Sequence, residues 1–121
     1  MLKGRVILLT EDQEINQEIF LGILQGSGIQ VDIAFNGEEA IKKSREKEYS
    51  LIMMDIEMPI MDGYEATKVI RTENSTVPII ALTSKSSRED ISKTKAIGMN
   101  EHLSKPIEAK ILYQTFSKYI N

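Results

Sequence analysis

The chain contains no cysteine and no tryptophan among its 121 residues, and it has only three prolines. Without cysteine there can be no disulfide, no thiolate nucleophile and no cysteine metal site, which fits a cytoplasmic protein. Positive charge is not in excess either: 15 lysines and arginines stand against 18 aspartates and glutamates, a formal net charge of −3. A nucleic-acid-binding module normally carries a basic face, so the composition disfavours that class.

Long apolar stretches are absent as well. The longest purely apolar runs have about four residues, whereas a bilayer-spanning helix needs about 20. No basic leader followed by an apolar segment opens the chain, so we expect no secretion signal. The apolar fraction of 41% and the charged fraction of 27% are those of a folded protein. The length fits one compact domain over residues 1–121.

Five short apolar runs alternate with segments that have apolar residues at helical spacing. The runs predict strands at 6–9, 31–34, 51–54, 77–82 and 101–104. The intervening patterns predict helices at 15–24, 36–49, 64–71, 86–98 and 108–119. Alternating units of this size favour a doubly wound five-stranded parallel sheet, covered by helices on both faces as a three-layer αβα sandwich. A closed barrel would need eight such units.

Polar side chains follow the predicted strands at the points where the strands end. Glu11 and Asp12 follow the first strand, Asp55 the third, Thr83 the fourth and Lys105 the fifth. In open α/β sheets, ligands bind at the carboxyl ends of the strands. Three carboxylates at one edge would repel one another, and Mg²⁺, which prefers hard oxygen ligands, would relieve that repulsion. The pattern therefore predicts a metal and phosphate site at this edge.

Asp55 is the candidate nucleophile, because carboxylates accept phosphoryl groups covalently and an apolar strand would hold this one rigidly. Lys105 would pair with a phosphate oxygen and Thr83 would donate its hydroxyl, since phosphoryl transfer depends on positioning and charge stabilisation. Taken singly, each residue has an ordinary interpretation as a helix cap, a strand-end threonine or a solvated lysine. Their joint occurrence at four strand ends favours the site.

Four segments together resemble the receiver domain of two-component response regulators, the CheY-like family. They are ILLTED at 7–12, MMDIEMPIMDG at 53–63, IIALTS at 79–84 and LSKPI at 103–107. The resemblance covers nearly the whole chain. It implies a flavodoxin-like fold with strand order 2-1-3-4-5. The domain itself would not be a turnover enzyme beyond its own phosphorylation and dephosphorylation.

The resemblance also implies a role for each acidic residue. Asp55 looks like the phosphorylated aspartate and Asp12 like the direct ligand of Mg²⁺, with Mn²⁺ as an alternative ion. Glu11, where many members have aspartate, would help to hold metal-bound water. The backbone carbonyl of Glu57, two residues after the nucleophile, would be a further metal ligand.

On the same basis, Lys105 looks like the lysine that pairs with the phosphoryl group, and its peptide bond to Pro106 is expected to be cis. Thr83 looks like the switch hydroxyl that moves toward that group. His102 stands where the family usually has a tyrosine or phenylalanine that rotates on activation. As a switch it could respond to pH, because imidazole titrates near neutrality; otherwise it would only cover the edge of the sheet.

The segments 54–59 and 98–106 look most like receivers of hybrid sensor histidine kinases. The chain would then be an excised cytoplasmic domain whose partner is a histidine-kinase core or a histidine phosphotransfer domain, with no nucleic acid or membrane contact. The face formed by helix 86–98, strand 101–104 and helix 108–119 would change on phosphorylation. A weak or phosphorylation-dependent dimer is a further expectation.

Several alternatives stay open. The chain could be a stand-alone response regulator. It could also be a Mg²⁺-dependent phosphohydrolase with an aspartyl nucleophile, although Glu57 fills the place of the second aspartate imperfectly and no cap domain is present. A degenerate interaction module is disfavoured by the complete residue set. A nucleotide- or flavin-binding domain is disfavoured because the glycine-rich phosphate loops are absent.

Overall fold

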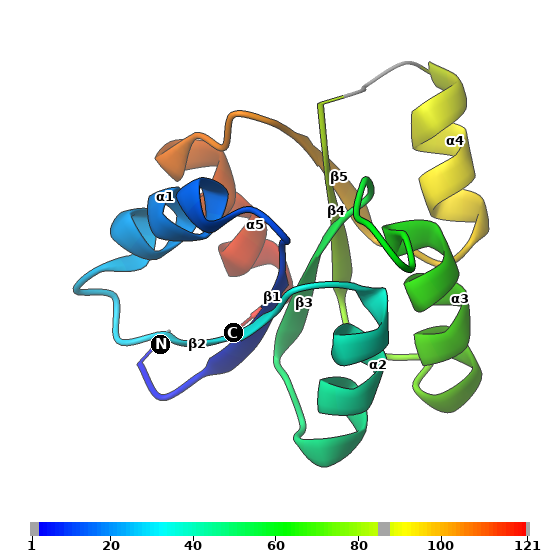
Figure 1. Ribbon diagram of the computed structural model, residues 1–121. Coiled ribbons are helices and arrows are strands. Elements are labelled where there is room, and N and C mark those ends of the chain that lie inside the picture. Colours follow the sequence, from blue (N-terminus) through cyan, green and yellow to red (C-terminus); the bar gives the residue numbers. More distant parts are fainter. Residues whose placement is uncertain (1–2, 85–87, 121) are drawn as a thin grey trace.

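A five-stranded parallel sheet with strand order β2-β1-β3-β4-β5 forms the centre of the molecule, as predicted (Figure 1). The computed structural model describes residues 3–84 and 88–120. The strands are β1 (Val6–Thr10), β2 (Gln30–Ala34), β3 (Leu51–Asp55), β4 (Ile79–Thr83) and β5 (Glu101–Ser104). Every residue of β3 and β4 is buried. Apart from their last residues, Asp55 and Thr83, these strands are continuous apolar runs, as is typical of strands covered on both faces.

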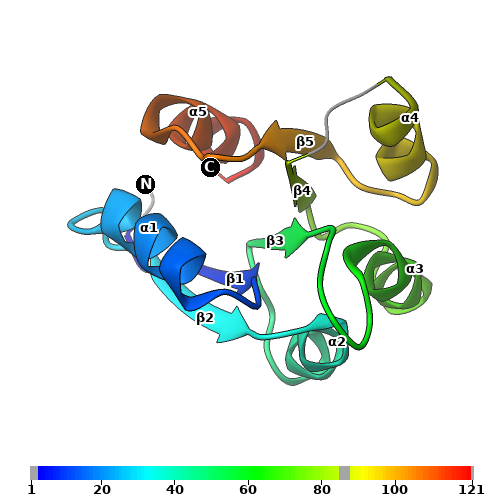
Figure 2. The same ribbon diagram turned by 45° about the horizontal axis from the view of Figure 1, so that its top comes forward.

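Helices cover both faces of the sheet, which confirms the doubly wound architecture. They are α1 (Glu14–Leu24), α2 (Gly37–Glu46), α3 (Gly63–Glu73), α4 (Arg88–Ala96) and α5 (Ala109–Tyr119). Figure 2 shows α1 and α5 on one side of the sheet and α2, α3 and α4 on the other. Within the described residues, no helix has the length and apolarity needed to cross a bilayer.

The alternation of side chains along each strand divides the core into two layers. Leu8, Ile52 and Met54 lie in the layer beneath α2 and α3, whereas their neighbours in sequence face α1 and α5. The α1 and α5 layer contains Ile7, Leu9, Phe20, Leu24, Leu51, Met53, Ile80, Leu82, Leu103, Leu112, Phe116 and Ile120. Side chains of β1 and β3 pack into both core layers. The carboxyl ends of these two strands are therefore held rigidly.

Side chains that cap the helices fix where α2 and α3 begin. The Asn36 side chain accepts a hydrogen bond from Glu39 N–H at 2.9 Å, and Glu39 Oε1 accepts one from Phe35 N–H at 3.0 Å. These two hydrogen bonds satisfy backbone N–H groups at the start of α2, as helix-capping side chains do. Asp62 caps α3 in the same way, with Glu65 N–H at 2.9 Å. Both helices therefore start at the carboxyl edge of the sheet.

Some predicted boundaries were wrong by a few residues. β4 begins at Ile79 rather than at 77, because Pro78 has no N–H to donate to the ladder. α2 ends at Glu46, and the chain turns extended at Lys47 so that the Tyr49 hydroxyl reaches Asp32 at 2.8 Å. The predicted start of the fourth helix at residues 86 and 87 lies outside the described residues.

Candidate functional site

Asp55 lies at the end of β3, the central strand of the sheet, and its side chain is almost fully buried. One carboxylate oxygen accepts a hydrogen bond from Lys105 Nζ at 2.9 Å. The other accepts one from the backbone N–H of Glu57 at 3.1 Å. The carboxylate of Asp55 is thus held between a cation and a backbone donor.

Glu11 approaches the same lysine from β1. Its Oε1 lies 3.0 Å from Lys105 Nζ, and its Oε2 accepts a hydrogen bond from Gln13 N–H at 3.1 Å. The backbone of Glu11 is fixed as well, because its carbonyl accepts a hydrogen bond from the buried Gln17 side chain at 2.8 Å. Its N–H donates to the carbonyl of Ala34 at 3.0 Å. The carboxylate therefore has little freedom to move away from Asp55.

Asp12 completes a group of three carboxylates. One ligand atom each from Glu11, Asp12 and Asp55 lies within 4.8 Å of the others, although Glu11 and Asp12 follow β1 and Asp55 ends β3. The structure thereby brings together the three acids that the sequence singled out. Three hard oxygen donors at this spacing are a donor set that suits Mg²⁺.

The electrostatics of the three carboxylates also favour a bound cation. Burial raises the pKa of Asp55 to about 6, and the charge of Glu11 adds to this effect, while Lys105 offsets part of it. Burial also raises the pKa of Glu11, but hydrogen bonds from Gln13 N–H and Lys105 outweigh it and hold that pKa below its usual value. Burial and the neighbouring Glu11 raise the pKa of Asp12. One lysine leaves the three acids with excess negative charge, which a divalent cation would neutralise.

Thr83 and Lys105 lie side by side at the ends of β4 and β5. Thr83 is buried, and its carbonyl accepts a hydrogen bond from Lys105 N–H at 2.9 Å. The peptide bond between Lys105 and Pro106 is cis, as the resemblance implied. Next to Thr83, the Ser84 hydroxyl donates a hydrogen bond to the Glu57 carboxylate at 3.1 Å, which links the segments after β4 and β3.

His102 lies on β5, where it pairs with Ala81 of β4. Its residue is half-buried, and both ring nitrogens are buried without a hydrogen-bond partner among the described residues. Because Leu103 faces α5, His102 faces the opposite layer, on the side of α4. This position agrees with either of its two predicted roles and leaves both as predictions.

Gln13 and Gln17 are parts of the site that the sequence analysis missed. Gln17 is buried in α1, and both glutamines hold Glu11 through hydrogen bonds. A buried polar residue within an amphipathic helix is the available signal, because buried polar groups require partners. The sequence alone does not show that the partner is the backbone of Glu11.

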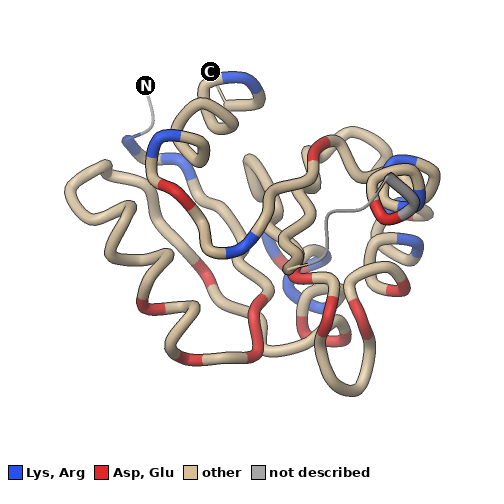
Figure 3. Tube along the Cα trace, turned by 90° about the horizontal axis from the view of Figure 1, so that it is seen from above, with Lys and Arg blue, Asp and Glu red and all other residues tan. Residues whose placement is uncertain are grey.

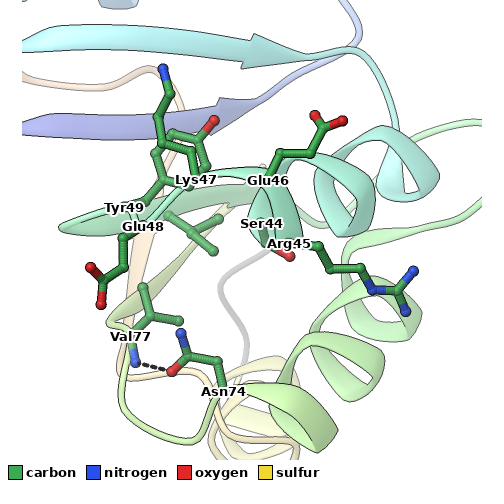
Figure 4. Close-up of a pocket in the computed structure, with 9 residues that line it drawn as sticks. Ser44, Arg45, Glu46, Lys47, Glu48, Tyr49, Asn74 and Val77 are labelled. Carbon is green, nitrogen blue, oxygen red and sulfur yellow. Dashed lines mark hydrogen bonds between the residues drawn. The ribbon is translucent and has the colours of Figure 1, made fainter.

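A pocket lies at the opposite, amino end of the sheet, between the last turns of α2 and α3 (Figure 4). Polar groups around it are paired internally: Asn74 Oδ1 accepts a hydrogen bond from Val77 N–H at 3.0 Å, and Arg45 pairs with Glu73 at 2.7 Å. These interactions are structural. The chemistry of the site lies at the carboxyl edge, where acidic residues gather (Figure 3).

The fold and the site define a doubly wound α/β domain that holds its reactive groups at the strand ends. Residues 7–117 match the family described as response regulator receiver domain. Hybrid signal transduction histidine kinase G of Dictyostelium discoideum is 41% identical over 118 residues, which cover 93% of this chain and 3% of that kinase. Two-component response regulator ORR41 of Oryza sativa subsp. japonica is 38% identical over 117 residues, 93% of this chain and 92% of that protein. The chain belongs to the receiver domains of two-component systems.

Solved structures of receiver domains have the same fold as this chain. The receiver domain of sensor histidine kinase PA1611 from Pseudomonas aeruginosa PAO1 has a TM-score of 0.89 and 36% identity, with 97% of this chain and 98% of that chain covered. A magnesium ion is coordinated in its active-site cleft. The receiver domain of Ssk1 from Saccharomyces cerevisiae, crystallised with the histidine phosphotransfer protein Ypd1, has a TM-score of 0.91 and 30% identity, with 98% and 90% covered.

Proposed function

We propose that Asp55 is the phosphoacceptor of a two-component phosphorelay. A carboxylate oxygen of Asp55 attacks the phosphorus of a phosphohistidine, and the new O–P bond forms as the P–N bond breaks. The departing ring nitrogen keeps that electron pair and, with a proton on the other ring nitrogen, leaves as neutral imidazole. The single observation that carries this proposal is the burial of the Asp55 carboxylate between Lys105 and the acids Glu11 and Asp12.

Asp12, Asp55 and the backbone carbonyl of Glu57 would hold Mg²⁺ directly, and Glu11 would hold it through water. The related PA1611 receiver, with magnesium in its cleft, supports this choice of ion. When bound, the ion supplies positive charge that neutralises the incoming phosphoryl group and the carboxylates around it. Mn²⁺, which takes similar oxygen ligands, is the alternative ion.

Lys105 and Thr83 would bind the phosphoryl group after transfer. Lys105 Nζ already lies 2.9 Å from Asp55, so it can pair with a phosphoryl oxygen attached there. Phosphorylation brings a charge of about −1.5 to −2 and new acceptor oxygens, to which the Thr83 hydroxyl can donate. Movement of Thr83 and of His102 would bias the face formed by α4, β5 and α5 between two states.

The proposed donor is a phosphohistidine on a histidine-kinase core or a histidine phosphotransfer domain. α1 exposes Ile15 at 60% and Ile19 at 46%, beside the carboxyl edge. A small pocket between α1 and the segment after β5 continues this surface toward Lys105, with Ile19, Pro106 and Ile107 in its lining. The complex of the Ssk1 receiver with Ypd1 supports a partner of this class. A weak or phosphorylation-dependent dimer also stays a prediction.

Two contexts for the domain follow from the relatives. The chain spans 3% and 7% of the lengths of the first two hybrid kinases it matches, but 92% of ORR41. We favour an origin within a hybrid kinase, because two hybrid kinases share 41% identity with the chain. A stand-alone regulator is the alternative. A cytoplasmic location stays a prediction.

The test is intact mass spectrometry after incubation with acetyl phosphate, with and without Mg²⁺, on the wild type and on Asp55→Asn. Asp32→Asn is the matched control. Asp32, on β2, is also a carboxylate with a cationic partner, because Lys47 lies 2.8 Å from it, but it is not part of the acidic group. We expect one added phosphoryl group that requires both Mg²⁺ and Asp55 and is retained in Asp32→Asn. Continuous release of phosphate without a trapped adduct would instead support the phosphohydrolase alternative.

A further inference from the structure

Ile60 has a backbone conformation that isoleucine rarely adopts. Its φ is 71°, and it is the one non-glycine residue with positive φ in the described ranges 3–84 and 88–120. The N–H of Met61 donates to the carbonyl of Pro59 at 2.8 Å, which makes Ile60 the central residue of a γ-turn with positive φ. For a β-branched residue this region is strained, because its side chain crowds the backbone.

Glycine begins the two helices that contact this loop, α2 and α3, at positions where close approach requires it. A Cβ at position 63 would lie 2.3 Å from the carbonyl oxygen of Asp55, and one at position 37 would lie 2.7 Å from that of Met61. Position 60, where glycine or asparagine would relieve the backbone, has isoleucine instead. Backbone geometry therefore explains Gly63 and Gly37 but does not explain Ile60.

Packing within the chain does not explain Ile60 either. Its exposed fraction is 74%, the highest among the exposed large apolar residues of the described chain. The loop is held at its ends by other groups: Gly37 N–H donates to the carbonyl of Met61 at 3.2 Å, and Gly63 N–H to that of Ile56 at 3.0 Å. The turn would form without an isoleucine side chain, which makes no buried contact that offsets the strain.

The position of Ile60 indicates what the side chain contacts. It lies five residues after Asp55, in the loop that leaves β3 at the carboxyl edge. The hydrogen bond between Gly37 and Met61 brings this loop against the start of α2, where Phe35 is 50% exposed. A donor that brings a phosphoryl group to Asp55 must approach over this edge, beside both exposed side chains.

The acidic residues near Ile60 indicate which charges a partner surface would carry. Besides Asp55, three acidic residues lie within five positions of Ile60 in the sequence: Glu57 and Glu65 are exposed and Asp62 is half-buried. A complementary surface would offer an apolar recess for the isoleucine and lysine or arginine around it.

We propose that Ile60 is a specificity-determining contact with the phosphohistidine domain that phosphorylates this chain. The proposal rests on the proposed function of Asp55 as phosphoacceptor. The strained turn presents the side chain outward, and the donor buries it in an apolar recess with a basic rim next to its phosphohistidine. Backbone strain that no interaction within the fold offsets is a signal of function. Here the burial of the Ile60 side chain in the complex would offset it.

The test compares three substitutions. Ile60→Asn and Ile60→Gly relieve the backbone and remove the apolar side chain, whereas Ile60→Leu keeps an apolar side chain without β-branching. Melting temperature reports strain. Labelling by acetyl phosphate reports the chemistry of Asp55, and transfer from purified phosphohistidine domains, Ypd1 of Saccharomyces cerevisiae among them, reports docking.

We expect Ile60→Asn to melt about 2–5 °C higher than the wild type. Its transfer rate from the fastest donor should fall about tenfold or more, Ile60→Gly should lose transfer likewise, and Ile60→Leu should stay within about threefold of the wild type, as one well-buried apolar contact implies. Higher stability together with slower transfer is a combination that a purely structural role would not produce. Unchanged transfer in Ile60→Asn would overturn the proposal, and so would equal losses in Ile60→Leu and Ile60→Asn.

Different results would contradict the role of Asp55 and the role of Ile60. If acetyl phosphate does not label Asp55 in the wild type, the proposed function fails. If acetyl phosphate labels the wild type but no phosphohistidine domain does, the donor class fails and the role of Ile60 fails with it. If acetyl phosphate and a phosphohistidine domain both label the wild type, the transfer rates of the three Ile60 variants test the role of Ile60.

Discussion

The ionised carboxylate of Asp55 should weaken the fold, so Asp55→Asn should be more stable than the wild type at neutral pH. Asp55 is 2% exposed, and burial together with the charge of Glu11 raises its pKa to about 6. In the unfolded chain the same group titrates at its ordinary value of 3.8. The folded state therefore binds this proton more tightly than the unfolded state does.

The size of the effect follows from the two pKa values. A difference of about 2 pH units, at about 1.4 kcal/mol each, corresponds to about 3 kcal/mol. The stabilising effect of the bound proton is fully present below pH 3.8 and is lost as the pH rises through about 6. Above pH 6 the wild type bears the full cost of the buried charge. Asparagine resembles the protonated acid in shape and does not titrate, so Asp55→Asn avoids that cost.

The assay is urea unfolding of both proteins across this pH range, with EDTA present to keep divalent ions away. Contributions from the other titrating groups largely cancel in the difference between the two free energies of unfolding. We expect the difference to be near zero at about pH 4 and to rise to about 3 kcal/mol in favour of Asp55→Asn above pH 6. A difference that does not change with pH would refute the reasoning, and so would an Asp55→Asn variant that is less stable at neutral pH.

Asp32→Asn is the control with the opposite sign. The hydrogen bond from Lys47, together with that from Tyr49, holds the pKa of Asp32 below its usual value. Its contribution to stability is present above pH 3.8 and is lost as the pH falls through the lower folded value. Asp32→Asn should therefore be less stable than the wild type at neutral pH, and the two proteins should converge in acid.

Three further predictions concern the metal site and the packing around it. Mg²⁺ at a hundredfold excess over its Kd should stabilise the wild type by about 2.7 kcal/mol and Asp12→Ala by much less, measured by melting at several ion concentrations. Arg71→Ala should cost about 2 kcal/mol in urea unfolding, because Arg71 donates to the carbonyl of Gly98 at 2.8 Å and to Asn100, whereas Arg45→Ala at an exposed ion pair should cost less than about 1 kcal/mol. Gly63→Ala should cost roughly 1–3 kcal/mol or more, because its Cβ would lie 2.3 Å from a backbone oxygen, and a variant within error of the wild type would contradict that contact.

The sequence could predict the sheet and the acidic cluster for one physical reason. In a parallel sheet all strand ends of one kind lie at the same edge, so residues that follow the strands meet in space. Glu11, Asp12 and Asp55 therefore come together although Asp55 is more than 40 residues away from the other two. Lys105 and Thr83 follow from the same rule.

Features that depend on tertiary packing could not be read in this way. Ile15 and Ile19 share the helical period of the core residues Phe20 and Leu24, yet the structure exposes the first two and buries the others. Period alone does not show which part of an apolar stripe lies over the sheet. The left-handed backbone of Ile60 was equally invisible, because neither proline nor isoleucine predicts positive φ at that position.

The destabilising charge and the proposed activity have the same origin. β3 is buried at every position, and this packing keeps Asp55 in a place where its charge is costly. A divalent cation and the deletion of the charge would each remove the same unfavourable term, so their effects on stability should not add. Asp55→Asn in saturating Mg²⁺ should be no more stable than Asp55→Asn in EDTA, while the wild type gains from the ion. Additive gains would show that the ion acts on another group and that the excess charge of this cluster is not what attracts it.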